Sequence, residues 1–272
     1  LEVFAMINKV IQLRDDDPEI TLTTYVQDEA WKKRDAILVI PGGGYSCVCS
    51  DREGEPIALA FLSRGVNAFV LHYSVGKKAV FPRPLIDASL AMKHIKEHAE
   101  EYHIDPERVF CTGFSAGGHL AASLGTFWNL PEITEAGIPE GINKPAGMIL
   151  CYAVLIGGEG AHKGSFYNIL GKTDPTDEEL SRWSIEKHIG EQTVPAFFMH
   201  TSNDPVVPVR NALDTASVMA AQHKKFELHI YPDGPHGVAL GDWQTGRGNK
   251  ACDDAKIAEW VENAVYWMTN RA

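Results

Sequence analysis

The sequence predicts an α/β fold built on a mostly parallel sheet of about eight strands flanked by helices. Two observations predict it. Short apolar, β-prone segments alternate along the chain with segments whose apolar residues recur at helical spacing. In addition, the pentapeptide Gly113-Phe114-Ser115-Ala116-Gly117 joins one such strand to the start of a helix of small residues.

The predicted strands are apolar or alternating segments bounded by turn residues. They are Val3–Arg14, Glu19–Gln27, Ala36–Ile40, Asn67–Tyr73, Arg108–Thr112, Ala146–Leu155, Ala196–His200 and Phe226–Tyr231. The predicted helices are Pro56–Arg64, Pro84–Tyr102, the segment after Ser115, Pro208–His223 and Asp253–Met268. Ile104-Asp105-Pro106 is expected to stop the longest of them.

Two segments interrupt this alternation, 128–144 and 157–193, and both are rich in glycine, proline and charge. We expect these insertions to form a small cap above the edge of the sheet that carries the functional site. Ordinary long connections are the alternative. No internal repeat or linker divides the chain, so residues 1–272 are expected to form one domain.

Composition excludes some classes of function. The chain has 25 Lys and Arg against 36 Asp and Glu, a net charge of −11, which argues against a nucleic-acid surface. No signal peptide opens it and no apolar run approaches membrane-spanning length. We therefore expect a cytoplasmic protein without a membrane partner, whose oligomeric state is left open, a homodimer included.

The cysteines point to a reducing compartment. There are five of them, an odd number: Cys47, Cys49, Cys111, Cys151 and Cys252. Cys111 and Cys151 lie in predicted buried strands, which favours reduced thiols over a disulfide framework. Cys47-x-Cys49 has no matching second pair, so no zinc site is expected.

The pentapeptide around Ser115 is a G-x-S-x-G motif in the context of strand, sharp turn and helix. This context is typical of a nucleophile elbow, which projects a serine hydroxyl from the carboxyl edge of a sheet. Gly113 and Gly117 are needed there because side chains would collide where the helix doubles back over the strand. An incidental serine in a glycine-rich turn is the alternative.

A nucleophilic serine needs a base and an acid that orients the base. His236 is the preferred base, since its loop follows the last predicted strand; His119, His200, His223 and His229 fit structural or surface roles better. Asp204 is the preferred acid, because it follows the strand before. Asp233 is expected to shape its turn, Asp214 lies on a helix, and Asp174 and Asp177 lie in an insertion.

Attack by serine on a carbonyl creates an oxyanion, which backbone N–H groups can stabilise. We expect one donor from Ala116, directly after the serine, and the other from the glycine turn at Gly43 or Gly44. A phosphate-binding loop is the alternative use of these glycines. The turn lacks both the lysine of a P-loop and the spacing of a dinucleotide site.

Several segments of the chain resemble those of a known family. The chain is similar to the α/β-hydrolase superfamily, and within it to the esterase/lipase group that includes acetylxylan-esterase-like sugar hydrolases of bacteria. The matching segments are Val39–Tyr45, Glu53-Gly54-Glu55-Pro56, Ile104–Val109, Gly113–Leu120, His200–Asp204 and Pro235-His236-Gly237. Lipase-like relatives carry His-Gly-Gly-Gly, whereas this chain has Pro41 at the histidine position, which favours the sugar-esterase-like group.

The resemblance implies a triad of Ser115, Asp204 and His236, the same residues that spacing selects. It also implies ester hydrolysis through an acyl-enzyme without a metal or an organic cofactor. The expected substrate is a short acyl ester, acetyl groups on sugars or xylo-oligosaccharides in particular. Tyr45, Trp183 and Trp243 are the candidate substrate contacts. A general carboxylesterase, an oligopeptidase-like hydrolase and a non-catalytic binding protein are the alternatives.

Overall fold

The structure, a computed structural model, describes residues 6–28 and 31–272. Within these residues one sheet contains nine strands, in the order β1-β3-β5-β4-β6-β7-β8-β9, with β2 also paired to β3. They are β1 (Met6–Ile7), β2 (Val10–Gln12), β3 (Thr21–Gln27), β4 (Arg34–Ile40), β5 (Asn67–His72), β6 (Ile104–Phe114), β7 (Met148–Cys151), β8 (Ala196–Thr201) and β9 (Phe226–Tyr231). From β5 to β9 neighbouring strands are parallel, and only the pairs made by β3 are antiparallel. The predicted mostly parallel sheet is confirmed.

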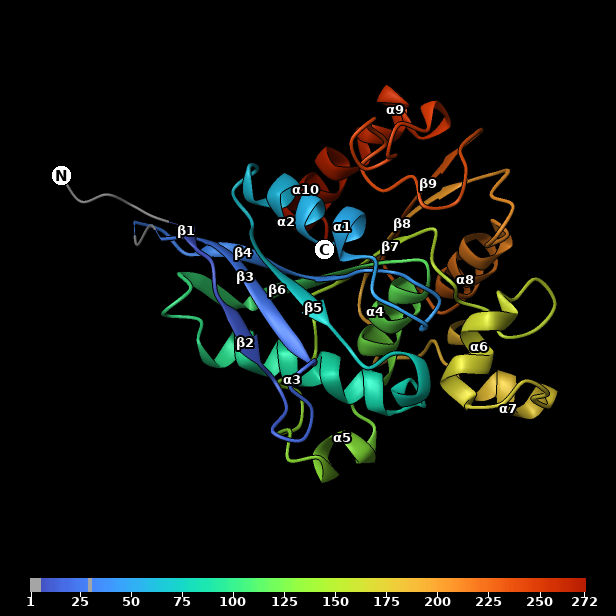
Figure 1. Cartoon of the computed structure of the whole chain (residues 1–272), viewed down its shortest axis with the longest axis horizontal. Helices are drawn as coiled ribbons and strands as arrows, with labels where there is room; N and C mark the ends of the chain where they lie inside the picture. The colour runs from blue at the N-terminus through green and yellow to red at the C-terminus, as the bar shows by residue number, and fades with distance from the viewer. Residues whose placement is uncertain (1–5, 29–30) are drawn as a thin grey trace.

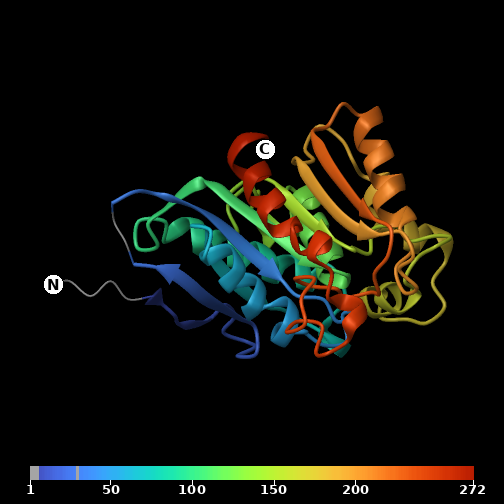
Figure 2. The same ribbon diagram turned by 90° about the horizontal axis from the view of Figure 1, so that it is seen from above.

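Helices cover both faces of this sheet (Figures 1 and 2). They are α1 (Ser50–Glu53), α2 (Glu55–Leu62), α3 (Arg83–Glu97), α4 (Ala116–Phe127), α5 (Pro131–Glu135), α6 (Lys163–Leu170), α7 (Asp177–Arg182), α8 (Arg210–Ala221), α9 (Ala255–Ala258) and α10 (Trp260–Asn270), with short 3-10 turns at Gly76–Lys78, Ile185–Lys187 and Lys250–Cys252. One apolar core lies under α3, α4 and α8, and the other under α2 and α10. Strand β4 is apolar at successive positions because Leu38 faces the first core and Ile37 and Val39 face the second.

Several predicted elements have different bounds. The predicted first strand, Val3–Arg14, appears as the separate β1 and β2, and its residues 3–5 lie outside the described residues. Ile104–Pro106 belongs to β6, where a register shift against β4 accommodates it, and the preceding helix ends earlier, at Glu97. The predicted strand Ala146–Leu155 shrinks to β7, and the closing helix is divided at Glu259 into α9 and α10.

The first insertion and helix α6 of the second insertion lie at opposite edges of the sheet. Helix α4 runs back from Ser115, so segment 128–144 follows it at the amino ends of the strands. There residues 140–142 and 144–146 line a pocket of about 670 Å³ together with Pro106 and residues 191–195. This segment therefore does not form the cap expected of it. Helix α6 of segment 157–193 does lie at the carboxyl edge, where Asn168 donates a hydrogen bond of 2.8 Å to the Gly44 carbonyl. The end of the segment, residues 191–193, returns to the pocket at the amino edge.

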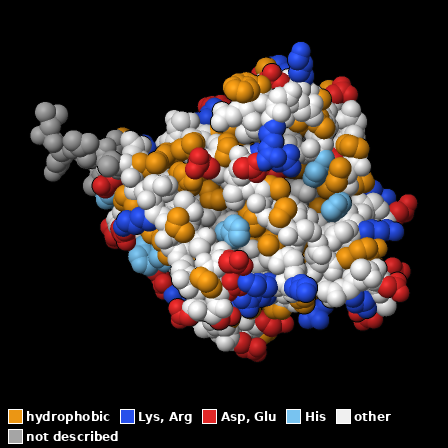
Figure 3. Space-filling model, viewed as in Figure 1, with side chains coloured by type: hydrophobic (Ala, Val, Ile, Leu, Met, Phe, Trp, Pro, Cys, Tyr) orange, Lys and Arg blue, Asp and Glu red, His pale blue; other side chains and the backbone are white. Residues whose placement is uncertain are grey.

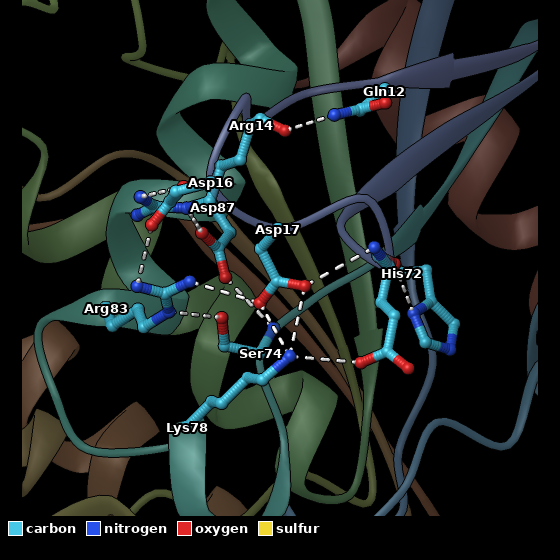
Figure 4. A network of polar contacts seen from close by, with 10 residues as sticks. Gln12, Arg14, Asp16, Asp17, His72, Ser74, Lys78, Arg83 and Asp87 are labelled. Atoms are coloured by element: carbon cyan, nitrogen blue, oxygen red, sulfur yellow. Dashed lines mark hydrogen bonds and ion pairs between the residues drawn. The ribbon is translucent and has the colours of Figure 1, made fainter.

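A cluster of ion pairs fastens the β2–β3 hairpin to α3 (Figure 4). Asp87 of α3 accepts a hydrogen bond from Arg14 Nε, and its carboxylate is fully buried. Asp17, at the tip of the hairpin, pairs with Lys78 Nζ at 2.8 Å and with Arg83 Nη2 at 3.1 Å. These contacts hold the antiparallel edge of the sheet against the helical layer.

Charges of both signs are interspersed over the face of the molecule seen in Figure 3, and Lys and Arg do not gather there into one basic surface. This distribution agrees with the net charge of −11. Within residues 6–28 and 31–272, no helix has both the length and the apolar character needed to cross a membrane.

Candidate active site

Ser115 occupies the sharp turn between β6 and α4. Its backbone has φ 54° and ψ −119°, a conformation that costs a non-glycine residue about 1–3 kcal/mol. Neighbouring backbone holds it there, since the Ser115 N–H donates to Cys151 O at 3.1 Å and the Ser115 carbonyl accepts from Val154 N–H at 3.0 Å. A Cβ on Gly113 would stand 2.1 Å from the Gly117 carbonyl oxygen, which confirms why that position must be glycine.

The loops after β8 and β9 bring an acid and a base to this serine. His236 Nε2 lies 2.8 Å from Ser115 Oγ, and His236 Nδ1 lies 2.7 Å from Asp204 Oδ2. The Asp204 carboxylate is fully buried, while the His236 side chain is 15% exposed, so the histidine can meet a substrate. The three residues predicted as a triad therefore form one connected chain of hydrogen bonds.

Asp204 is held as an anion. Its Oδ1 accepts the N–H groups of Val206 at 2.8 Å and Val207 at 2.9 Å, and Oδ2 contacts His200 Nε2 at 3.6 Å. Burial raises the pKa of Asp204, but these contacts and the hydrogen bond from His236 outweigh burial and keep its pKa well below the usual range. A buried carboxylate on Nδ1 fixes the His236 tautomer that leaves Nε2 able to accept the serine proton.

The glycine turn after β4 presents N–H groups beside the serine. Gly43 and Gly44 line the same pocket as Ser115 and have φ of +130° and +64°. Within the part of the chain that the structure describes, the N–H groups of Gly43, Gly44 and Ala116 donate no hydrogen bond. Unpaired donors around a nucleophile are what an oxyanion site requires, and the donor set stays a prediction.

The pocket at Ser115 has a volume of about 290 Å³ and walls that combine polar and apolar groups. Sequence reasoning missed five of its lining residues: Cys49, Arg52, Glu53, His162 and Val206. His162 belongs to the insertion and carries no motif, and its Nδ1 lies 2.9 Å from Ser165 Oγ. Burial and the nearby His236 lower the pKa of His162, so it faces the pocket as a neutral ring. Glu53 belongs to the segment Glu53-Gly54-Glu55-Pro56, which matches the family but predicted no role for this residue.

The three candidate aromatic contacts do not line this pocket. Tyr45 is fully buried and its hydroxyl pairs with His119 Nδ1 at 2.8 Å. Trp183 is 5% exposed and packs edge-on against Phe81. A direct substrate contact by either ring would require it to leave the core. Trp243, in the loop after His236, is 70% exposed, and its contact with a saccharide stays a prediction.

The other candidates have the structural roles expected of them. His119 is buried in α4 between Tyr45 and Trp183. His229 pairs with Glu227 on β9, and Asp233 accepts from Asn203 within the neighbouring loop. Within the described residues, no group of His, Cys, Asp and Glu is arranged to hold a metal ion.

The chain matches a known protein family over most of its length. The model of the family described as BD-FAE matches residues 22–219. The chain belongs to the BD-FAE family. A crystal structure of an acetyl ester-xyloside bifunctional hydrolase from Caldicellulosiruptor lactoaceticus is similar with a TM-score of 0.84 and 32% identity, over 96% of this chain and 95% of that chain. The α/β-hydrolase fold predicted from the sequence is confirmed.

Two curated relatives of this BD-FAE chain are larger proteins. Endo-1,4-beta-xylanase B of Butyrivibrio fibrisolvens is 38% identical over 213 residues, which are 77% of this chain and 33% of the xylanase. Acetylxylan esterase of Xylanibacter ruminicola is 31% identical over 214 residues, which are 76% of this chain and 42% of the esterase. The chain thus spans about a third to two fifths of the length of these relatives.

Proposed function

We propose that this chain is a serine carboxylesterase that hydrolyses short acyl esters, in particular acetyl groups on sugars or short xylo-oligosaccharides. The observation that carries the proposal is the hydrogen-bonded chain from Ser115 through His236 to Asp204. A serine hydroxyl is a poor nucleophile until a base takes its proton, and this arrangement supplies both the base and its orienting acid.

In the proposed reaction, Ser115 Oγ attacks the ester carbonyl while His236 Nε2 takes its proton. The developing oxyanion is stabilised by the N–H groups of Ala116 and of Gly43 or Gly44, each donor lowering the barrier by about 3 kcal/mol. His236 then protonates the departing alcohol, and Asp204 stabilises the imidazolium. Water repeats the same steps on the acyl-enzyme and releases the acid.

The size of the pocket and two of the polar side chains that line it support the substrate class. A volume of about 290 Å³ favours a small acyl group. Arg52 and His162 offer hydrogen-bonding groups to a hydroxyl-rich alcohol. Similar proteins are described as an acetylxylan esterase and an acetyl ester-xyloside hydrolase, which supports acetylated sugars as substrates. The five cysteines are free thiols, which agrees with the predicted cytoplasmic location.

Hydrolysis of p-nitrophenyl esters of increasing acyl length, compared with acetylated xylobiose, tests this proposal. We expect a preference for acetate, faster release of acetate from the sugar than from the aryl ester, and loss of almost all turnover in Ser115→Ala with an unchanged fold. Parental turnover in Ser115→Ala would overturn the nucleophile assignment. Rates that rise with acyl length or ignore the sugar would leave a general carboxylesterase, and cleavage of amide substrates would favour an oligopeptidase-like hydrolase.

A further inference from the structure

A buried carboxylate stands in the wall of the pocket and takes no part in the triad. Glu53, the last residue of α1, is 1% exposed. Its Oε2 accepts the Gly42 N–H at 2.8 Å, its Oε1 accepts the Tyr152 hydroxyl at 3.0 Å, and Arg52 Nη2 lies 3.5 Å from Oε1. Burial of a charged group is costly unless hydrogen bonds and an opposite charge compensate it, and here both are present.

The bond to Gly42 reaches the root of the glycine turn. It occupies the Gly42 N–H, so the next amides along the chain, those of Gly43 and Gly44, are the ones left for an oxyanion. Glu53 also packs tightly there, since a Cβ on Gly42 would stand 2.8 Å from Glu53 Oε2 and 3.1 Å from Ser115 Cβ. The position of the carboxylate therefore determines where the turn sits relative to the nucleophile.

The bond to Tyr152 reaches the histidine loop. Tyr152 directly follows β7 and is 1% exposed. Its hydroxyl, which donates to Glu53, also accepts the Ala239 N–H at 3.1 Å, three residues beyond His236. Its ring packs edge-on against the His236 imidazole, with 5.1 Å between the ring centroids. One phenol thus connects Glu53 to the backbone and the ring of the loop that carries the base.

We propose that Glu53 is a positioning residue that, through Gly42 and Tyr152, sets the oxyanion turn and the His236 loop relative to each other. This inference rests on the proposed function. An ionised carboxylate can accept both the Gly42 N–H and the Tyr152 O–H. An amide of the same size has only one acceptor oxygen and would direct N–H donors at one of these two donors. The two acceptor oxygens of Glu53, and not only its shape, are therefore required.

The central variant is Glu53→Gln, assayed on p-nitrophenyl acetate. We expect kcat to fall about 10- to 100-fold while KM changes less than about twofold, because a displacement of donors by a fraction of an ångström acts on the transition state more than on the bound ester. Inhibition by a trifluoromethyl ketone, which forms a tetrahedral adduct with serine, should weaken by the same factor as kcat/KM.

Tyr152→Phe and the double variant test the connection. Tyr152→Phe removes only the hydroxyl and should lower kcat in the same direction. If both residues act through one link, the double variant loses little more than Glu53→Gln alone. The chain offers a matched control pair, since Tyr25 donates a 2.9 Å hydrogen bond to Glu55 away from the pocket. Glu55→Gln and Tyr25→Phe should retain parental kcat.

Urea unfolding and labelling by a fluorophosphonate complete the test. A structural role alone predicts that activity falls in proportion to the folded fraction, and that result, or parental kcat in Glu53→Gln, would overturn the proposal. Labelling reports the positioning of Ser115 without reference to the ester. If the parent labels but hydrolyses no ester, the proposed function fails, and a labelling rate reduced in Glu53→Gln still supports the positioning role. A parent that neither labels nor hydrolyses overturns both.

Discussion

His119 is a histidine whose two partners define its state. Its Nε2 lies 2.7 Å from the Trp183 carbonyl, which can only accept, so Nε2 carries the proton and Nδ1 accepts from the Tyr45 hydroxyl. Burial lowers the pKa of His119 to about 4. The folded protein therefore holds a neutral ring in the core directly behind the nucleophile.

This environment predicts an acid sensitivity. Between pH 6.5 and about 4 the unfolded chain binds a proton at His119 that the folded chain does not, so the free energy of unfolding falls as the pH falls, by up to about 1.4 kcal/mol per pH unit from this residue. His119→Gln, which keeps a donor and an acceptor but does not titrate, should show a shallower slope in urea unfolding measured from pH 7 to pH 5. A parental slope in the variant would contradict the assignment.

Among single residues, the sequence predicts those that stand in a recognisable local motif or directly follow a predicted strand. Ser115 stands in a strand–turn–helix motif, and Asp204 and His236 each follow a recognisable strand, so topology alone brings them to one edge. His162 and Glu53 could not be predicted in the same way. His162 has no distinctive sequence neighbourhood. Glu53 stands in a segment that matches the family, but its role arises from contacts with Gly42 and Tyr152 that the segment does not reveal.

Among the elements, the β2–β3 hairpin is joined to α3 by buried polar contacts. Asp87 of α3 accepts from Arg14 and from the Ser74 N–H at 2.9 Å, so one carboxylate joins the hairpin, the end of β5 and the helix (Figure 4). These contacts add to the pairing of β3 with β5 and to the burial of Leu22 and Val26 in the core.

Asp87→Ala should therefore lower the free energy of unfolding by about 3 kcal/mol, because it leaves the Arg14 guanidinium and a buried N–H without their acceptor. Urea unfolding followed by tryptophan fluorescence measures the change. Glu100→Ala, which breaks the exposed Lys33–Glu100 pair, is the control and should leave the midpoint unchanged. Equal effects of the two substitutions would show that burial of the Asp87 pair does not matter.

Element type was easier to predict from sequence than element bounds. Apolar runs such as β4 and β8 are buried on both faces and are recognised by composition alone. The bounds of β6 could not be predicted in this way. Ile104-Asp105-Pro106 carries a helix-stop signal, yet its backbone pairs with β4 through an irregular register. The break at Glu259 likewise leaves no mark in the apolar periodicity that α9 and α10 share.

For the whole molecule, one sheet supports every part of the candidate site. The triad residues follow β6, β8 and β9, the glycine turn follows β4, and both apolar cores pack on that same sheet. Residues 1–272 are thus expected to unfold as one domain. Loss of tryptophan fluorescence and loss of p-nitrophenyl acetate hydrolysis should coincide along a urea titration. Two separated transitions would show that the site and the core belong to different folding units.

The placement of segment 128–144 has a practical consequence. Because α4 delivers this segment to the amino ends of the strands, its exposed loop faces away from Ser115. A Cβ on Gly137 would meet no atom within 4 Å, so a side chain or a linker finds no obstruction there, although the φ of +81° favours glycine itself. Attachment to a solid support or fusion to a carbohydrate-binding module at this loop would orient the catalytic pocket outward, toward substrate in solution or on a fibre.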